Sequence, residues 1–165
     1  MSKKQAKVNY LKLIVSLIIP LLIGFIGSAF TTPYIKTWYA DLYKPFFNPP
    51  NWIFVPVWTG LFLLMGIALY LVWNEDLSKN KTKMKDMAIQ IFGLQLIANV
   101  FWSFIFFTLQ VPFVAFLEIL FLWFLIFWTI ESFWKINKTA AYLLFPYLAW
   151  VSFASILNLS IAFLN

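Results

Sequence analysis

The chain has 165 residues, of which 63% are hydrophobic and 11% are charged, and its mean hydropathy is +0.85. A soluble domain of this length could not bury that much apolar surface, so the composition indicates an integral membrane protein. The net charge of +6 comes from lysines beside apolar segments, so membrane topology explains it better than nucleic acid, and we expect no nucleic-acid partner. The absence of Cys and His argues against thiol or imidazole catalysis and the usual haem ligands, and we expect neither a metal site nor a cofactor.

Apolar stretches long enough to cross a membrane follow one another along the chain, because about 20 helical residues span a hydrocarbon core of about 30 Å. These stretches are far too long for barrel strands, so helices are expected. The first stretch exceeds the usual core of a signal peptide and is kept as a helix. We therefore expect an all-α membrane protein of one domain, residues 1–165, built as a five-transmembrane-helix bundle at about 11–31, 52–73, 88–108, 113–134 and 141–163.

The connection between the first two expected helices, residues 32–51, is rich in proline and aromatic side chains. Pro45, Pro49 and Pro50 stiffen a segment that would otherwise be a long flexible loop. A rigid segment of this kind suits a lid that gates a ligand site. It is also compatible with a proline-rich start to the second helix.

The lysine distribution predicts the orientation in the membrane. With an odd number of spans, only Lys36 and Lys44 fall on the side of the C-terminus. The positive-inside rule therefore places the N-terminus in the cytoplasm and the C-terminus outside, and we expect a bacterial plasma membrane. The lysines on the N-terminal side are Lys3, Lys4, Lys7, Lys12, Lys79, Lys81, Lys83, Lys85, Lys135 and Lys138.

Polar residues recur at helical spacing within two of the expected spans. Gln95, Asn99, Trp102 and Ser103 share one face of the third span, and Trp150, Ala154 and Asn158 share one face of the fifth. A polar group in lipid is costly unless it has a partner, so both faces should point inward. The amides either join helix to helix or, together with the indoles, line a small-molecule site.

The nine tryptophans fall into two groups by depth. Those near expected helix ends are typical of an interfacial belt, namely Trp38, Trp52, Trp73 and Trp134. A belt does not explain the deeper ones, which are Trp58, Trp102, Trp123, Trp128 and Trp150. Of these, Trp123 and Trp128 could face lipid or a neighbouring subunit.

Several spaced motifs, in the correct order on the expected helices, resemble one known family, the TspO/MBR family of tryptophan-rich sensory proteins and translocator proteins. The resemblance covers roughly residues 20–165 and is specific because it combines many motifs. They are Trp38-Tyr39-Ala40, Lys44-Pro45, Asn48-Pro49-Pro50, Trp52, Pro56-Val57-Trp58-Thr59, Met65-Gly66, Leu71-Val72-Trp73, Gln95 to Asn99 with Trp102-Ser103, and Pro146 to Trp150 with Phe153-Ala154 and Leu157-Asn158.

This resemblance implies a pocket covered by the first loop, porphyrins such as protoporphyrin IX and other flat lipophilic molecules as ligands, and a homodimer. By position, the implied ligand-binding residues are Trp38, Pro45, Phe47, Trp52, Trp58, Asn99, Trp102, Trp150, Phe153 and Ala154. Many relatives carry Trp where this chain has Phe47, which keeps a stacking face but lacks the N–H donor. An acid is frequent at the position of Glu118. Its carboxyl acts either as a gate or proton carrier, or as a group that reaches the interface or caps a neighbour's amide.

Three functions follow as hypotheses. The leading one is a membrane receptor, sensor or transporter that binds a tetrapyrrole in an intramembrane pocket. The second is an enzyme that degrades porphyrin with light and oxygen, in which Trp58 and Trp150 would be the catalytic indoles. The third is an assembly partner without a ligand, whose small residues Gly24 and Ser28 pack helices at four-residue spacing.

Overall fold

The computed structural model describes residues 8–165, and this part of the chain is helical with five helices long and apolar enough to span a membrane. The expected all-α bundle is therefore confirmed. Lys3, Lys4 and Lys7, which contribute to the predicted orientation, lie outside the described residues. In chain order the elements are α1 (Tyr10–Ile35), α2 (Trp38–Asp41), the short 3-10 helix η1 (Asn51–Ile53), α3 (Phe54–Trp73), α4 (Lys79–Ser103), the π-helical turn η2 (Phe104–Thr108), α5 (Pro112–Trp134) and α6 (Lys138–Leu164).

Two expected boundaries were wrong, for different physical reasons. Helix α1 does not break at residue 32 but continues to Ile35 with Pro33 inside it, because a proline removes one helical hydrogen bond without preventing the helix from continuing. Helix α4 begins at Lys79 rather than at 88, since charged residues are excluded from lipid but not from a helix that extends beyond it. The expected loop 32–51 accordingly holds the end of α1 and all of α2.

Local capping residues fix several helix starts. The Asn9 side chain accepts a hydrogen bond from the Lys12 backbone N–H at the start of α1, and Asn137 accepts one from Ala140 at the start of α6. Pro112 occupies the first turn of α5, where its missing N–H costs nothing. These signals lie in the sequence on either side of the apolar runs.

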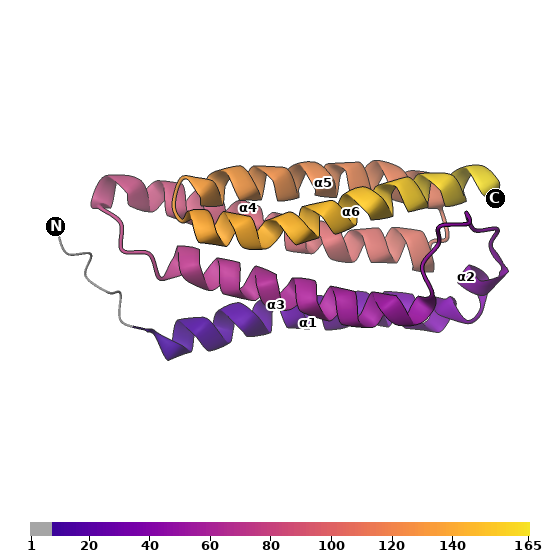
Figure 1. Ribbon diagram of the computed structural model, residues 1–165, viewed down its shortest axis with the longest axis horizontal. Coiled ribbons are helices and arrows are strands. Elements are labelled where there is room, and N and C mark those ends of the chain that lie inside the picture. The colour runs from indigo at the N-terminus through magenta and orange to yellow at the C-terminus, as the bar shows by residue number, and fades with distance from the viewer. Residues whose placement is uncertain (1–7) are drawn as a thin grey trace.

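The five long helices form a closed ring of neighbours in the order α1, α3, α6, α5, α4 and back to α1. Figure 1 shows them running along one long axis, with α2 and the C-terminus at the same end and the α3–α4 and α5–α6 connections at the other. Helices α1 and α3 approach closely: a Cβ on Gly66 would lie 2.8 Å from the Leu17 Cα atom. Gly24 of α1 lies directly against the Phe62 ring of α3.

The tightest packing lies toward the end that carries the α3–α4 and α5–α6 connections. Large side chains that are almost fully buried there include Met65, Val72, Phe92, Phe133 and Leu144. Phe92 and Phe133 stack with ring centroids 5.7 Å apart, joining α4 to α5. The bundle is therefore solid at this end, and its hollow part lies toward α2.

Candidate functional site

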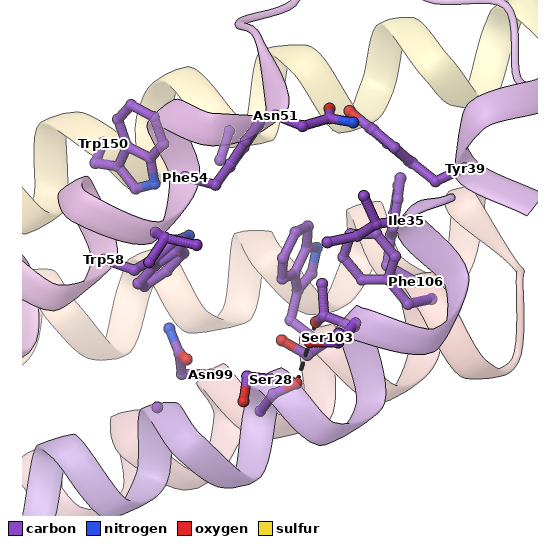
Figure 2. A pocket seen from close by; sticks show the side chains of 18 of the residues that line it. Ser28, Ile35, Tyr39, Asn51, Phe54, Trp58, Asn99, Ser103, Phe106 and Trp150 are labelled. Carbon is purple, nitrogen blue, oxygen red and sulfur yellow. Dashed lines mark hydrogen bonds between the residues drawn. The ribbon is translucent and has the colours of Figure 1, made fainter. Parts of the chain in front are cut away.

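A cavity of about 370 Å³ lies inside the ring of helices, in the half nearer α2. Its walls come from α1, α3, α4 with η2, and α6, and Tyr39 of α2 and Asn51 of η1 line it too, while α5 contributes no lining residue. Figure 2 shows labelled side chains from these elements pointing toward one common space. The volume falls in the range typical of small-molecule sites, and most of the lining is apolar.

Nine aromatic side chains line the cavity. Trp58 of α3 stacks on Phe62 with centroids 5.5 Å apart, and Trp102 of α4 stacks on Phe106 at 5.4 Å. Trp150 of α6 meets Phe54 edge to face at 5.9 Å. Because these contacts fix the rings, three indoles from three different helices are presented to the cavity in defined positions.

The indoles differ in what their N–H groups do. Trp102 Nε1 donates to Asn158 Oδ1 at 3.0 Å, and Asn158 Nδ2 in turn donates to the Pro112 carbonyl at 2.7 Å. Within residues 8–165, neither Trp58 Nε1 nor Trp150 Nε1 has a hydrogen-bond partner. Two indole donors are thus available to a ligand, whereas the third holds the bundle together.

Asn99 supplies a buried amide at the cavity wall. Its Nδ2 donates to the Tyr147 hydroxyl at 3.0 Å, which fixes the orientation of the amide. Within residues 8–165 no donor bonds to Asn99 Oδ1, so this atom is available as an acceptor at the cavity wall. Gln95, one turn earlier on the same face of α4, is 1% exposed but does not line the cavity, and its amide has no partner in the described chain.

The segment after α1, residues 36–50, covers the end of the cavity, and we call it the lid. Tyr39 of α2 lines the cavity and its hydroxyl donates to Asn48 Oδ1 at 2.9 Å. Burial raises the pKa of Tyr39 above its ordinary value, and the bond to Asn48 opposes this only in part. The phenol therefore keeps its proton, and this lid contact persists, throughout the neutral range.

Further contacts hold the lid in place. The Asn165 side chain hydrogen-bonds to both the N–H and the carbonyl of Tyr43, at 2.9 and 3.0 Å. Lys44 Nζ donates to the Ala40 and Leu42 carbonyls and lies 4.8 Å from the Tyr39 ring centre. The lid is thus a folded cap rather than a loose connection.

The structure brings together some of the residues expected at a ligand site and leaves others outside the cavity. Those that line it are Trp58, Asn99, Trp102, Trp150 and Ala154, and Ser103 and Asn158 from the same helix faces line it too. The others support its rim: Trp38 packs edge-on against Phe106, and Phe47 packs on Phe153, which itself contacts Trp150. Pro45 lies within the lid, and Trp52 is 72% exposed at the start of the second span.

The whole contribution of α1 to the cavity was absent from the expected site. Gly24, Gly27, Ser28 and Thr31 line it, with Thr31 Oγ1 bonded to its own helix at the Gly27 carbonyl. The spacing of Gly24 and Ser28 was visible in the sequence, but it was interpreted as helix packing. Small residues allow close approach of a helix and also make room for a guest, so spacing cannot separate the two roles.

These features define a class: an integral membrane protein of five spans that encloses an apolar, tryptophan-lined cavity beneath a folded lid. Comparison with known proteins then gives the family. The TspO/MBR family model matches residues 16–164, and the chain belongs to that family.

Named relatives agree with this assignment. The chain is 44% identical to the tryptophan-rich protein TspO of Archaeoglobus fulgidus, over 95% of this chain and 99% of that one. It is 43% identical to the protein of the same name from Chlorobaculum tepidum, over 88% and 90%. It is also 35% identical to the human translocator protein, over 81% of this chain and 78% of that one.

Proposed function

We propose that the cavity binds a flat lipophilic tetrapyrrole of the protoporphyrin IX type, and that the protein acts as a membrane receptor, sensor or transporter for it. The observation that carries this proposal is the convergence of Trp58, Trp102 and Trp150 with Asn99 on one enclosed apolar space. Planar guests stack on such rings, and a few fixed polar atoms orient them. The name of the human relative, translocator protein, is in keeping with a transport role.

The polar atoms of the site match a flat, largely apolar ligand that has carboxylates at its edge and N–H groups at the centre of its ring. The free N–H groups of Trp58 and Trp150 can donate to carboxylate or ring acceptors, and Asn99 Oδ1 can accept from a pyrrole N–H. With no His or Cys in the chain, a metal-free porphyrin is favoured over a haem held by an axial ligand. Membrane lipids surround the bundle, and a homodimer is part of the proposal.

A titration of the purified protein in nanodiscs with protoporphyrin IX tests the proposal, with the fluorescence of the porphyrin as the readout. Wild-type protein should show saturable binding. Ala154→Trp fills the cavity with an added indole, so the guest can no longer reach one of the wall rings. Binding should weaken by about tenfold or more, because one stacking contact is worth about 1–3 kcal/mol.

The matched control is Ala149→Trp, because Ala149 is exposed on the same helix and does not line the cavity. Its affinity should equal that of the wild type. Binding that never saturates, or that is equal in the two variants, would contradict the ligand site and favour a purely structural role in membrane assembly.

A second candidate function is light-driven degradation of the porphyrin with dioxygen as the oxidant. The observation that favours it is that Trp58 and Trp150 line the same cavity with unpaired N–H groups, so both would lie beside an excited ring. Under light and oxygen the bound porphyrin should give a new bilin-like absorbance. Trp58→Phe and Trp150→Phe should abolish that change while Trp134→Phe, outside the cavity, keeps it; an unchanged wild-type spectrum would eliminate the enzyme.

A further inference from the structure

The wall of the central cavity has an opening between α1 and α3. Within residues 8–165, the lining residues from α2, α4, η2 and α6 are all buried or half-buried, whereas seven lining residues are exposed and belong to α1, η1 or α3. We call this opening the lateral slot. It is edged on α1 by Leu21, Phe25, Ser28 and Thr32, and on the other side by Asn51, Val55 and Thr59.

The lateral slot faces the bilayer. Phe25 and Val55, one on each edge, are 74% and 72% exposed on the outer surfaces of two membrane-spanning helices. Large apolar side chains on the outer surface of a span lie against lipid tails. The cavity therefore communicates with the hydrocarbon beside the lid, by a path that does not pass through the lid.

The edges of the slot change from polar to apolar with distance from the lid. Thr32 and Asn51 lie nearest the lid, and within residues 8–165 their side chains have no hydrogen-bond partner. Farther from the lid the α1 edge carries Phe25 and Leu21. An amphiphile in this half of the bilayer is arranged in the same way, with its polar groups at the surface and its apolar body below them. A flat molecule with carboxylates on one edge can therefore move sideways into the slot without turning over.

The α1 edge is the side of the slot that is held least firmly. Only 17% of the most apolar stretch of α1 is buried, against 39% or more in each of the other four spans. Pro20 lacks the N–H that would bond to the Ser16 carbonyl, so α1 is weakened directly before the slot begins. Residues 21–32 can therefore bend away from α3 and widen the slot. At the far end from the lid, the Phe62 ring against Gly24 closes the slot.

We propose that the lateral slot is the entrance to the cavity, and that the tetrapyrrole is taken from the half of the bilayer on the lid side. The flat ring passes between Phe25 and Val55 with its carboxylate edge toward Thr32 and Asn51. This inference rests on the proposed function, because it concerns the route of the same guest. The lid serves as the roof of the entrance, so a loosened lid widens it.

A crosslink across the slot tests this route. Helices α1 and α3 are antiparallel and Gly24 meets Phe62, so Ser28 and Thr59 lie on facing edges. The chain has no native cysteine, so a reducible bis-methanethiosulfonate can join Ser28→Cys to Thr59→Cys specifically. The protein in nanodiscs is loaded with protoporphyrin IX, crosslinked and mixed with empty vesicles, and porphyrin fluorescence follows release. Release should slow by about tenfold or more and recover on reduction, because the ring can no longer pass between the helices.

Two other crosslinked pairs are the controls. Asn9→Cys with Tyr70→Cys joins the same two helices at the far end, where the Asn9 backbone N–H donates to the Tyr70 hydroxyl at 3.4 Å. This crosslink should leave the release rate unchanged. Tyr43→Cys with Asn165→Cys ties the lid to α6 at the place of the existing hydrogen bonds, and it should not slow release.

The outcomes separate the entrance from the binding site. Unchanged release from the slot pair overturns the lateral entrance, and faster release overturns it too, because the crosslinker then only displaces the guest. Slower release from the lid pair alone means that the guest passes beneath the lid, which also overturns it. Equilibrium titration of the wild type is read separately. An absence of saturable binding contradicts the proposed function itself, whereas saturable binding with an unchanged release rate contradicts only the entrance.

Discussion

Single buried side chains decide how the cavity wall is held. Asn158 of α6 is 1% exposed, accepts from the Trp102 indole and donates to the Pro112 carbonyl, so it joins α6 to α4 and to the start of α5. Asn158→Leu should lower the free energy of unfolding by about 1–2 kcal/mol, because two groups lose their partners inside the membrane. Thermal unfolding in detergent measures this loss.

Ser160→Ala is the matched control for this residue. Among the described residues the Ser160 hydroxyl bonds only to the Ile156 carbonyl of its own helix, so its loss should leave the melting temperature unchanged. Equal melting temperatures for Asn158→Leu and the wild type would show that the bridge contributes nothing to stability. Asn158→Leu should also loosen the Trp102 ring, because the indole N–H then loses the only hydrogen bond found for it in the described chain.

At the scale of elements, the lid acts as one unit tied to the end of α6. The Asn165 amide makes two hydrogen bonds to the backbone of Tyr43 and a third to the Ile161 carbonyl of its own helix. Asn165→Ala should speed release of bound porphyrin by about threefold to tenfold, because each exposed hydrogen bond contributes roughly 0.5–1.5 kcal/mol. Stopped-flow measurement of the release rate checks it.

Tyr43→Phe provides the control for the lid, since the Tyr43 side chain is 75% exposed and takes no part in the two backbone bonds. Its release rate should equal that of the wild type. A wild-type rate in Asn165→Ala would mean that the lid does not depend on this tie.

For the whole molecule, the arrangement of charge predicts the orientation. Lys83 and the other lysines of α4 lie at the end opposite the lid, and the chain has no cysteine, so single cysteines report cleanly on each side. In intact bacterial cells, a membrane-impermeant maleimide should label Phe46→Cys in the lid. It should label Lys83→Cys only after the cells are opened. The reverse pattern would contradict the cytoplasmic location proposed for the N-terminus.

Local chemistry explains which parts of the fold could be predicted. The spans follow from the length of each apolar run, and the inward faces of α4 and α6 follow from Asn99 and Asn158, which are both buried. The end of α1 at Ile35 and the start of α4 at Lys79 were missed because hydropathy indicates which residues lie in the hydrocarbon core, whereas a helix can extend beyond that core. The α1 wall of the cavity was missed because small residues such as Gly24 and Ser28 occur both where helices pack closely and where a cavity is lined, so the sequence does not distinguish the two roles.

The sequence by itself determined that the chain crosses a membrane as five helices, because a helix satisfies its own backbone amides in lipid and the apolar runs are too long for barrel strands. It also determined which polar and indole groups must avoid lipid. Only the tertiary structure decided that α1, α3, α4 and α6 enclose one cavity while α5 stands outside it. Which helices enclose the cavity depends on which helices become neighbours in the ring. Helices far apart in the sequence become neighbours through the packing of their whole faces, and no local sequence pattern specifies that packing.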